Sequence, residues 1–117
     1  MKKIITVDGP AGSGKEKVSK FISRKYNLHH IDSGIFYRKL AFELEKNNIK
    51  TNKKEKITNL IKKINKLSSR KNSFLRQEKI GVAASNIARY EFVRDFVNFQ
   101  QRLATKTLKN KKGFVID

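Results

Sequence analysis

A glycine-rich segment near the start of the chain has the residue types and spacing of a phosphate-binding loop. In the stretch TVDGPAGSGKEKVSK, residues 9–15 fit the pattern Gly-x-x-x-x-Gly-Lys. Glycine lets consecutive backbone N–H groups point into one concavity at the start of a helix, where phosphate oxygens bind, and Lys15 adds a positive charge near the terminal phosphates. The next position normally carries a Ser or Thr whose hydroxyl helps to hold Mg²⁺, and here it is Glu16. The pattern predicts phosphate binding by a loop that lacks one usual component. The alternative is a tight strand-to-helix turn that only needs glycine.

The loop is expected to lie between a strand and a helix. Residues 3–8 (KIITVD) form a compact apolar run rich in β-branched side chains, which Gly9 and Pro10 end, and this predicts a buried strand. From Gly14 the apolar spacing becomes helical and continues to Asn27, where the helix is expected to end. The apolar residues spaced to share one face of this helix are Val18, Phe21, Ile22 and Tyr26.

The rest of the chain continues the alternation of strands and helices. Residues 28–31 predict a second short strand, because the turn-like Asp32-Ser33-Gly34 follows them. Helical spacing then predicts further helices, and a last apolar run predicts a third strand; the expected ranges are helices at 35–45, 57–67, 80–88 and 92–108, a loop at 68–73 and a strand at 113–117. This order is typical of an α/β fold with a parallel sheet and flanking helices.

Length and composition restrict the classes of protein that the chain can represent. Its 117 residues suffice for one domain. No stretch approaches the roughly 20 apolar residues of a membrane span, and the absence of cysteine excludes disulfides and thiolate chemistry, so a cytoplasmic location is expected. The net charge of +18 attracts polyanions, both nucleic acids and nucleotides. Nucleic acid is the less favoured partner, because most lysines of residues 50–71 occupy polar positions between apolar helix residues.

Two segments together resemble the start of a bacterial cytidylate (CMP/dCMP) kinase, a member of the nucleoside monophosphate kinase family of P-loop NTPases. They are ITVDGPAGSGK and, one helix later, HHIDSGIFYR. The segment FLRQEKIGVAASNIARYEFVRDFVNFQQR resembles the family's helical region around an Ala-Ala-Ser run, and FVID resembles the strand before its Gly-Arg-Asp. The resemblance is weak only from about residue 47 to 73. It implies a P-loop kinase-like parallel sheet with three of five core strands present. The chain would be a single partial domain over 1–117, with 1–46 and 108–117 as its core and 47–107 as a helical acceptor-binding region.

The resemblance also implies an activity and the residues that carry it. An ATP-dependent nucleoside monophosphate kinase of this kind transfers the γ-phosphoryl group of ATP to CMP or dCMP, with Mg²⁺ as cofactor, and Lys15 would act in catalysis. The residues expected at the ATP phosphates are Gly9, Pro10, Ala11, Gly12, Ser13, Gly14, Lys15, Glu16 and Lys17. Those expected at CMP are Ser33, Tyr37, Arg38, Arg76, Ser85 and Arg94, and Asp8 and Asp117 are expected near Mg²⁺. Each has a structural alternative: Tyr37 as a packed aromatic, Ser85 as a small packing residue, Arg94 as a surface charge.

Three features depart from the family's pattern. Glu16 and Lys17 stand where the family has Gly and Thr, which puts Mg²⁺ binding in question. The interval SSRKNSF is too short for the family's inserted strands, and the chain ends at Asp117, before the expected Gly-Arg-Asp and the arginine-bearing lid. We therefore expect a fragment with little activity alone, whose first strand has an open apolar edge at Ile4, Ile5 and Val7; the complete protein is expected to be a monomer. Two alternatives stay open: another P-loop nucleotide or metabolite kinase, and a non-catalytic basic protein that binds nucleic acid.

Overall fold

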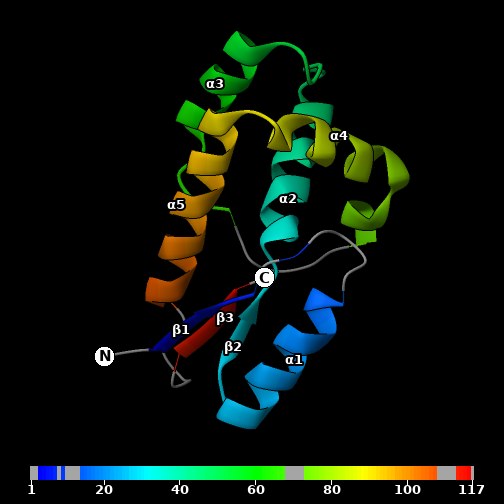
Figure 1. Cartoon of the computed structure of the whole chain (residues 1–117). Helices are drawn as coiled ribbons and strands as arrows, with labels where there is room; N and C mark the ends of the chain where they lie inside the picture. The colour runs from blue at the N-terminus through cyan, green and yellow to red at the C-terminus, as the bar shows by residue number, and fades with distance from the viewer. Residues whose placement is uncertain (1–2, 8, 10–13, 68–72, 108–112, 117) are drawn as a thin grey trace.

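The structure is an α/β fold in which helices flank one small parallel sheet (Figure 1). The computed structural model describes residues 3–7, 9, 14–67, 73–107 and 113–116. Its strands are β1 (Lys3–Thr6), β2 (His29–Ile31) and β3 (Gly113–Ile116). Its helices are α1 (Lys15–Tyr26), α2 (Ser33–Lys46), α3 (Lys54–Lys63), the 3₁₀ helix η1 (Ser73–Arg76), α4 (Glu78–Ala88) and α5 (Glu91–Thr107). The predicted fold class is confirmed. No helix in the described ranges has both the length and the apolar character needed to cross a membrane.

The three strands end level with one another at a single edge of the sheet. The order is β1-β3-β2, all parallel, and Ile116 of β3 is in register with Thr6 on one side and Ile31 on the other. The backbone N–H of Val7 extends this pairing by donating to the Ile116 carbonyl at 2.8 Å. In open α/β sheets ligands bind beyond the carboxyl ends of the strands. The glycine loop follows β1, and Ser33 follows β2. Both segments therefore begin at the edge of the sheet where a ligand is expected.

Glycine and asparagine set the two ends of α1. Gly14 precedes the helix with φ +88°, a left-handed conformation that costs glycine little because it has no Cβ. Asn27 ends the helix, as predicted, with φ 54° and ψ 55°, and its backbone N–H bonds to the Ser23 carbonyl. Between these ends α1 is poorly covered: Ser19 is its only buried residue among those described, and its hydroxyl has no hydrogen-bond partner there.

Helix α2 is the centre of the molecule's core. Its first turn is capped by the Asp32 carboxylate, which accepts a hydrogen bond from the Gly34 N–H at 3.0 Å. The helix packs most extensively on α4 and also contacts α5 and η1, and Figure 1 shows it running from the sheet between α5 and α4. Its buried side chains are Ile35, Phe36, Leu40, Ala41 and Leu44. Because α2 begins directly after β2, this packing fixes the position of any group on its first two turns.

Helix α3 is shorter than the spacing of its apolar residues predicts. The sequence suggests a helix to residue 67, but Ile64 is already extended, with φ −94° and ψ 116°. The cause is Gln100 of α5, which is 1% exposed. Its Oε1 accepts a hydrogen bond from the Leu67 N–H at 2.7 Å, and its Nε2 donates to the Asn65 carbonyl at 3.4 Å. A buried side-chain amide thus replaces the helical hydrogen bonding of this segment.

We expect Gln100→Leu to lower the free energy of unfolding by about 1–3 kcal/mol, because the buried Leu67 N–H would lose its acceptor. The measurement is chemical denaturation followed by circular dichroism. Gln101→Leu is the matched control, since Gln101 is only half-buried one position along the same helix, and it should cost less. Equal losses in the two variants would show that the amide of Gln100 is not what holds residues 65–67.

Candidate functional site

The start of α1 has the features of a phosphate-binding helix end. Because its N-cap is Gly14, no side chain caps the first backbone N–H groups. Such groups carry the partial positive charge of the helix dipole and bind anions well. Lys15 is the first helical residue and is half-buried, whereas Glu16 and Lys17 are exposed. Gly9 is exposed; Asp8 and four further predicted residues, Pro10, Ala11, Gly12 and Ser13, lie outside the described residues.

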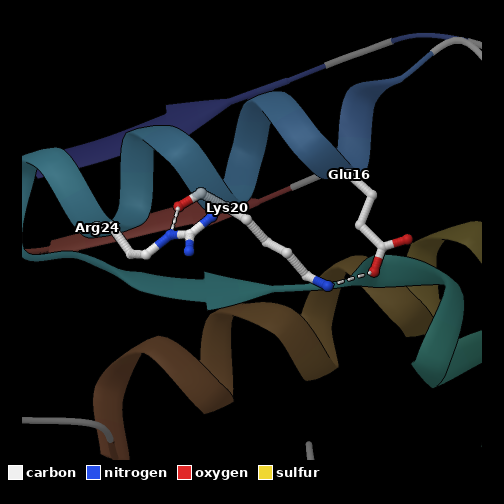
Figure 2. A network of polar contacts seen from close by, with 3 residues as sticks. All are labelled: Glu16, Lys20 and Arg24. Carbon is white, nitrogen blue, oxygen red and sulfur yellow. Dashed lines mark hydrogen bonds and ion pairs between the residues drawn. The ribbon is translucent and has the colours of Figure 1, made fainter.

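Glu16, which stands where the phosphate-loop pattern normally has Ser or Thr, forms an ion pair along the helix. Figure 2 shows Glu16, Lys20 and Arg24 on successive turns of α1, with the Lys20 ammonium 3.1 Å from Glu16 Oε1. The Arg24 Nε donates to the Lys20 carbonyl at 3.4 Å. About half of each side chain of the ion pair is exposed, so the pair adds at most about 1 kcal/mol to stability. Its main consequence is electrostatic: Lys20 partly offsets the negative charge that Glu16 places near the phosphate end of the helix.

The next predicted residues lie on the first turns of α2. Ser33 is the first residue of this helix, directly after the Asp32 cap. In the Asp32-Ser33-Gly34 motif, the first and last residues therefore form the capping hydrogen bond and position the serine. Tyr37 lies four residues further, about 6 Å along the helix axis. Burial raises the pKa of the Tyr37 hydroxyl, and the nearby positive charge of Arg94 opposes this shift. The hydroxyl is therefore protonated at neutral pH and can donate a hydrogen bond.

Arg38 joins three elements. Its Nη1 donates to the Leu75 carbonyl in η1 at 2.7 Å. A Cβ built on Gly81 of α4 would lie 3.3 Å from Arg38 Nη2, so the guanidinium packs on the bare backbone of this glycine. Sequence analysis did not identify Leu75 or Gly81 as partners of this arginine. The only available signal was the isolated glycine inside a helical pattern, which often marks a close approach by another group.

The remaining predicted acceptor residues lie on elements that pack around α2. Arg76 is exposed at the end of η1, and Ser85 is exposed on α4. Arg94 of α5 is exposed, and its Nη1 donates to the Ala88 and Arg89 carbonyls at 3.0 and 2.8 Å. Arg94 therefore satisfies the last carbonyls of α4, where a positive charge also favours the helix dipole.

Within the described residues, contacts connect some of the predicted acceptor residues with one another or with the elements around α2. Tyr37 interacts with the charge of Arg94, and Arg38 contacts η1 and α4. Two open hollows of about 570 and 510 Å³ occur in the described part of the chain. The first lies at the carboxyl end of α2, beside Asn48, Ile49 and Ala83, and the second lies at the α4–α5 junction. None of the predicted site residues lines either one.

The two acidic residues predicted to lie near Mg²⁺ follow the strand ends in the sequence. Asp8 and Asp117 lie outside the described residues, each next to one of the hydrogen-bonded pair Val7 and Ile116. Within the described ranges, no three His, Cys, Asp or Glu side chains are grouped as metal ligands. Glu16, the carboxylate in the first turn of α1, is paired with Lys20. The described residues thus provide no ready set of oxygen donors for the ion.

Comparisons with known proteins connect this geometry to one family. A family model described as cytidylate kinase matches residues 5–117. A cytidylate kinase of Mycoplasmopsis synoviae is 37% identical, and one of Fusobacterium nucleatum subsp. nucleatum is 33% identical; each match covers 97% of this chain and 55% of the relative. A bifunctional pantoate ligase/cytidylate kinase of Prochlorococcus marinus is 35% identical over 85% of this chain and 22% of that protein. The chain thus spans about half the length of the two cytidylate kinases.

Proposed function

The chain belongs to the cytidylate kinase family, and on this premise we propose that it forms the nucleotide-binding half of a kinase that transfers the γ-phosphoryl group of ATP to CMP or dCMP, giving CDP or dCDP, in the cytoplasm. The observation that carries the proposal is the level end of the three strands. Because of this register, the glycine loop and α2 both begin at the carboxyl edge of the sheet. The donor phosphates and the acceptor residues on α2 are thereby held near each other.

Each group contributes by binding and orientation. Phosphoryl transfer depends on bringing the two nucleotides together in line and on neutralising the charge of the transferring group. We assign the uncapped N–H groups at the start of α1, with Lys15, to the ATP phosphates. We assign Ser33, Tyr37 and Arg38 to CMP, with Arg94, Arg76 and Ser85 on the neighbouring elements. The protonated Tyr37 hydroxyl is suited to donate to a phosphate oxygen.

Mg²⁺ accompanies ATP in this proposal and would neutralise charge on its phosphates when bound. Mg²⁺ in proteins commonly keeps several waters and binds substrate phosphates together with only one or two carboxylates. Asp8 and Asp117 are our candidates for those carboxylates. The described residues offer no larger donor set, and no step of the mechanism is therefore assigned to a protein-bound ion.

The proposal is tested by nucleotide binding to this chain at constant ionic strength. We expect ATP and CMP to bind together, CMP and dCMP to bind more tightly than other nucleoside monophosphates, and neither to be displaced by an arbitrary oligonucleotide of equal charge. A preference for a different monophosphate or metabolite would instead indicate another P-loop kinase.

The second candidate function, nucleic-acid binding, has one observation in its favour, the net charge of +18. It predicts affinity for oligonucleotides of any sequence that falls steeply with salt concentration, because bound lysines and arginines release counterions. ATP or CMP at millimolar concentration would then displace a bound oligonucleotide only weakly. A kinase site would instead bind ATP and CMP in preference to the oligonucleotide.

We expect the double substitution Glu16→Gly with Lys17→Thr to raise ATP affinity and to make it more dependent on Mg²⁺, by roughly 3- to 10-fold each. It removes a carboxylate that repels phosphate and supplies a hydroxyl for the ion, and because it also removes the exposed Lys17 ammonium the net charge of the chain is unchanged. Isothermal titration with and without Mg²⁺ measures both effects. Glu16→Gln alone serves as the control, because it removes the charge without adding the hydroxyl. If affinity and Mg²⁺ dependence are unchanged in the double variant, neither residue perturbs the site.

A further inference from the structure

Helix α3 lies in a lysine-rich segment whose charge is not neutralised locally. The net charge of residues 50–66 is +6, from one glutamate and seven lysines: Lys50, Lys53, Lys54, Lys56, Lys62, Lys63 and Lys66. All seven lysines are exposed, and no ion pair joins any of them to a carboxylate in the part of the chain that the structure describes. Three exposed lysines on other helices, by contrast, each pair with a glutamate. Such a surface attracts polyanions, although charge alone does not distinguish it from a solvated face.

An open hollow of about 510 Å³ lies beside this segment, between the start of α3 and the α4–α5 junction. Figure 1 shows α3 and the start of α5 at the end of the molecule opposite the sheet. The lining of the hollow combines two cations, two aromatic rings and two carboxylates: Lys54, Arg89, Tyr90, Phe92, Glu91 and Asp95. Aromatic and guanidinium planes stack on nucleobases, and carboxylates accept hydrogen bonds from the exocyclic amino groups of bases. The hollow therefore offers contacts for a base that a solvated row of lysines would lack.

Arg89 is held in a defined position at the wall of this hollow. Its Nη2 donates to the Tyr90 hydroxyl at 2.9 Å, and its Cζ lies 4.9 Å from the centre of the Tyr90 ring. The tyrosine is itself fixed, because it is 8% exposed, its hydroxyl donates to the Thr51 carbonyl at 2.8 Å, and its ring stacks on that of Phe92 at 5.5 Å. The Lys54 ammonium lies 5.2 Å from the same ring centre. An exposed guanidinium is thus oriented before any ligand binds, which lowers the entropy cost of binding.

We propose that the seven lysines and this hollow, together called the α3 surface, bind a single-stranded nucleic acid. The lysines contact its phosphates, and one base enters the hollow, where it stacks on Arg89 and presents its amino group to Glu91 or Asp95. A double helix does not fit, because its bases are paired and stacked inside. None of the residues that we assign to ATP or CMP lines the hollow, so the proposal does not rest on the kinase function. It differs from attraction by net charge alone in predicting a preference for particular bases.

The test is fluorescence anisotropy of labelled single-stranded DNA of about 12 nucleotides, with an excess of CMP present so that a cytosine of the strand cannot occupy the proposed acceptor site. We expect oligodeoxycytidylate to bind roughly 3- to 10-fold more tightly than oligodeoxythymidylate of equal length, because thymine has no exocyclic amino group to donate. Equal affinity for the two strands would overturn the proposal, because charge alone would then explain binding. Displacement of the strand by phosphatidylserine vesicles at an equal concentration of negative charge would also overturn it, because the occupant would then be a membrane surface.

A matched pair of arginine variants locates the base. Arg89→Gln removes the guanidinium at the hollow and should weaken the binding of oligodeoxycytidylate by roughly 10-fold, the effect of losing one stacked contact to a base. Arg102→Gln removes the same charge from an exposed position further along α5 and should have little effect. Circular dichroism establishes that both variants are folded, since Arg89 also bonds to Tyr90. Equal losses of affinity in the two variants would contradict a base bound in the hollow.

A second pair of variants locates the phosphates. Lys62→Gln with Lys63→Gln should reduce the slope of log affinity against log salt concentration by about 1.4, since each phosphate contact on a single strand contributes about 0.7. Lys25→Gln with Lys106→Gln removes the same charge from exposed positions of α1 and α5 and should leave the slope unchanged. The same decrease in both double variants would show that α3 provides no specific path for the strand, and would overturn the proposal.

Discussion

Replacing Lys15 by Met should weaken ATP binding by roughly 10- to 100-fold, the effect of losing a charge-assisted hydrogen bond to phosphate. Lys15 is the first residue of α1, directly after the left-handed Gly14, and is half-buried at the end of the helix where no side chain caps the backbone N–H groups. Its ammonium is therefore the positive charge best placed to reach a phosphate bound there. Isothermal titration at constant ionic strength measures the loss.

The matched control for this prediction is Lys25→Met. Lys25 lies in the last turn of the same helix and is exposed. Ten residues of helix separate the two lysines, about 15 Å. Both variants lose one positive charge, so both change the overall field equally. If they weaken ATP binding to the same extent, the net charge of the chain, and not a site at the start of α1, attracts the nucleotide.

Replacing Arg38 by Met should have the second large effect, on both stability and CMP binding. The arginine donates to the Leu75 carbonyl at 2.7 Å and packs against Gly81, so its loss removes one hydrogen bond between α2 and η1 and one packing contact with α4. A hydrogen bond from a charged group contributes about 1.5–3 kcal/mol. We expect a lower midpoint of denaturation and, at a temperature where the variant remains folded, CMP affinity reduced by roughly 10- to 100-fold.

A second variant separates the two roles of Arg38. Gly81→Ala keeps the arginine but adds a Cβ about 3.3 Å from its Nη2, so the guanidinium must move by a few tenths of an ångström. If Arg38 binds CMP, this variant should lose CMP affinity and keep ATP affinity. If Arg38→Met lowers stability while CMP affinity is retained in both variants, the arginine serves only to hold η1 against α2.

The order of elements was predictable because local signals determine it. The β-branched run before Gly9, the glycines before Lys15 and the asparagine at residue 27 each specify a local conformation without help from distant residues. The start of α2 was placed two residues late, since the prediction treated Asp32 as part of a turn. The structure shows that its side chain caps the helix.

Features that depend on distant residues were not predictable from spacing. The end of α3 is determined by Gln100, which lies 33 residues from the Leu67 N–H that it binds. The contact between Arg38 and Leu75 spans 37 residues, and η1 itself was not predicted. The apolar face of α1 was identified correctly, but periodicity cannot tell what covers such a face. In the described residues three of its four side chains, those of Val18, Phe21 and Tyr26, are strongly exposed.

The candidate site was predictable in outline only. Its residues were found from the glycine pattern and the family resemblance, and the structure places Tyr37, Arg38 and Arg94 on elements that meet at α2. The roles of these residues in nucleotide binding remain predictions. Two of them also make structural contacts. Arg38 donates a hydrogen bond to η1, and Arg94 donates one to a carbonyl at the carboxyl end of α4. These contacts fix the positions of the two side chains. A substitution of a partner residue, such as Gly81→Ala, disturbs a contact without replacing a residue that is proposed to bind a nucleotide.

The most direct measurement is an amide NMR titration of this chain with ATP and then with CMP. We expect ATP first to shift the backbone amides of Gly14, Lys15 and Glu16, and CMP then to shift those of α2 around Tyr37 and Arg38. Shifts confined to the lysine-rich exposed surface of α3, with the start of α1 unchanged, would contradict this prediction.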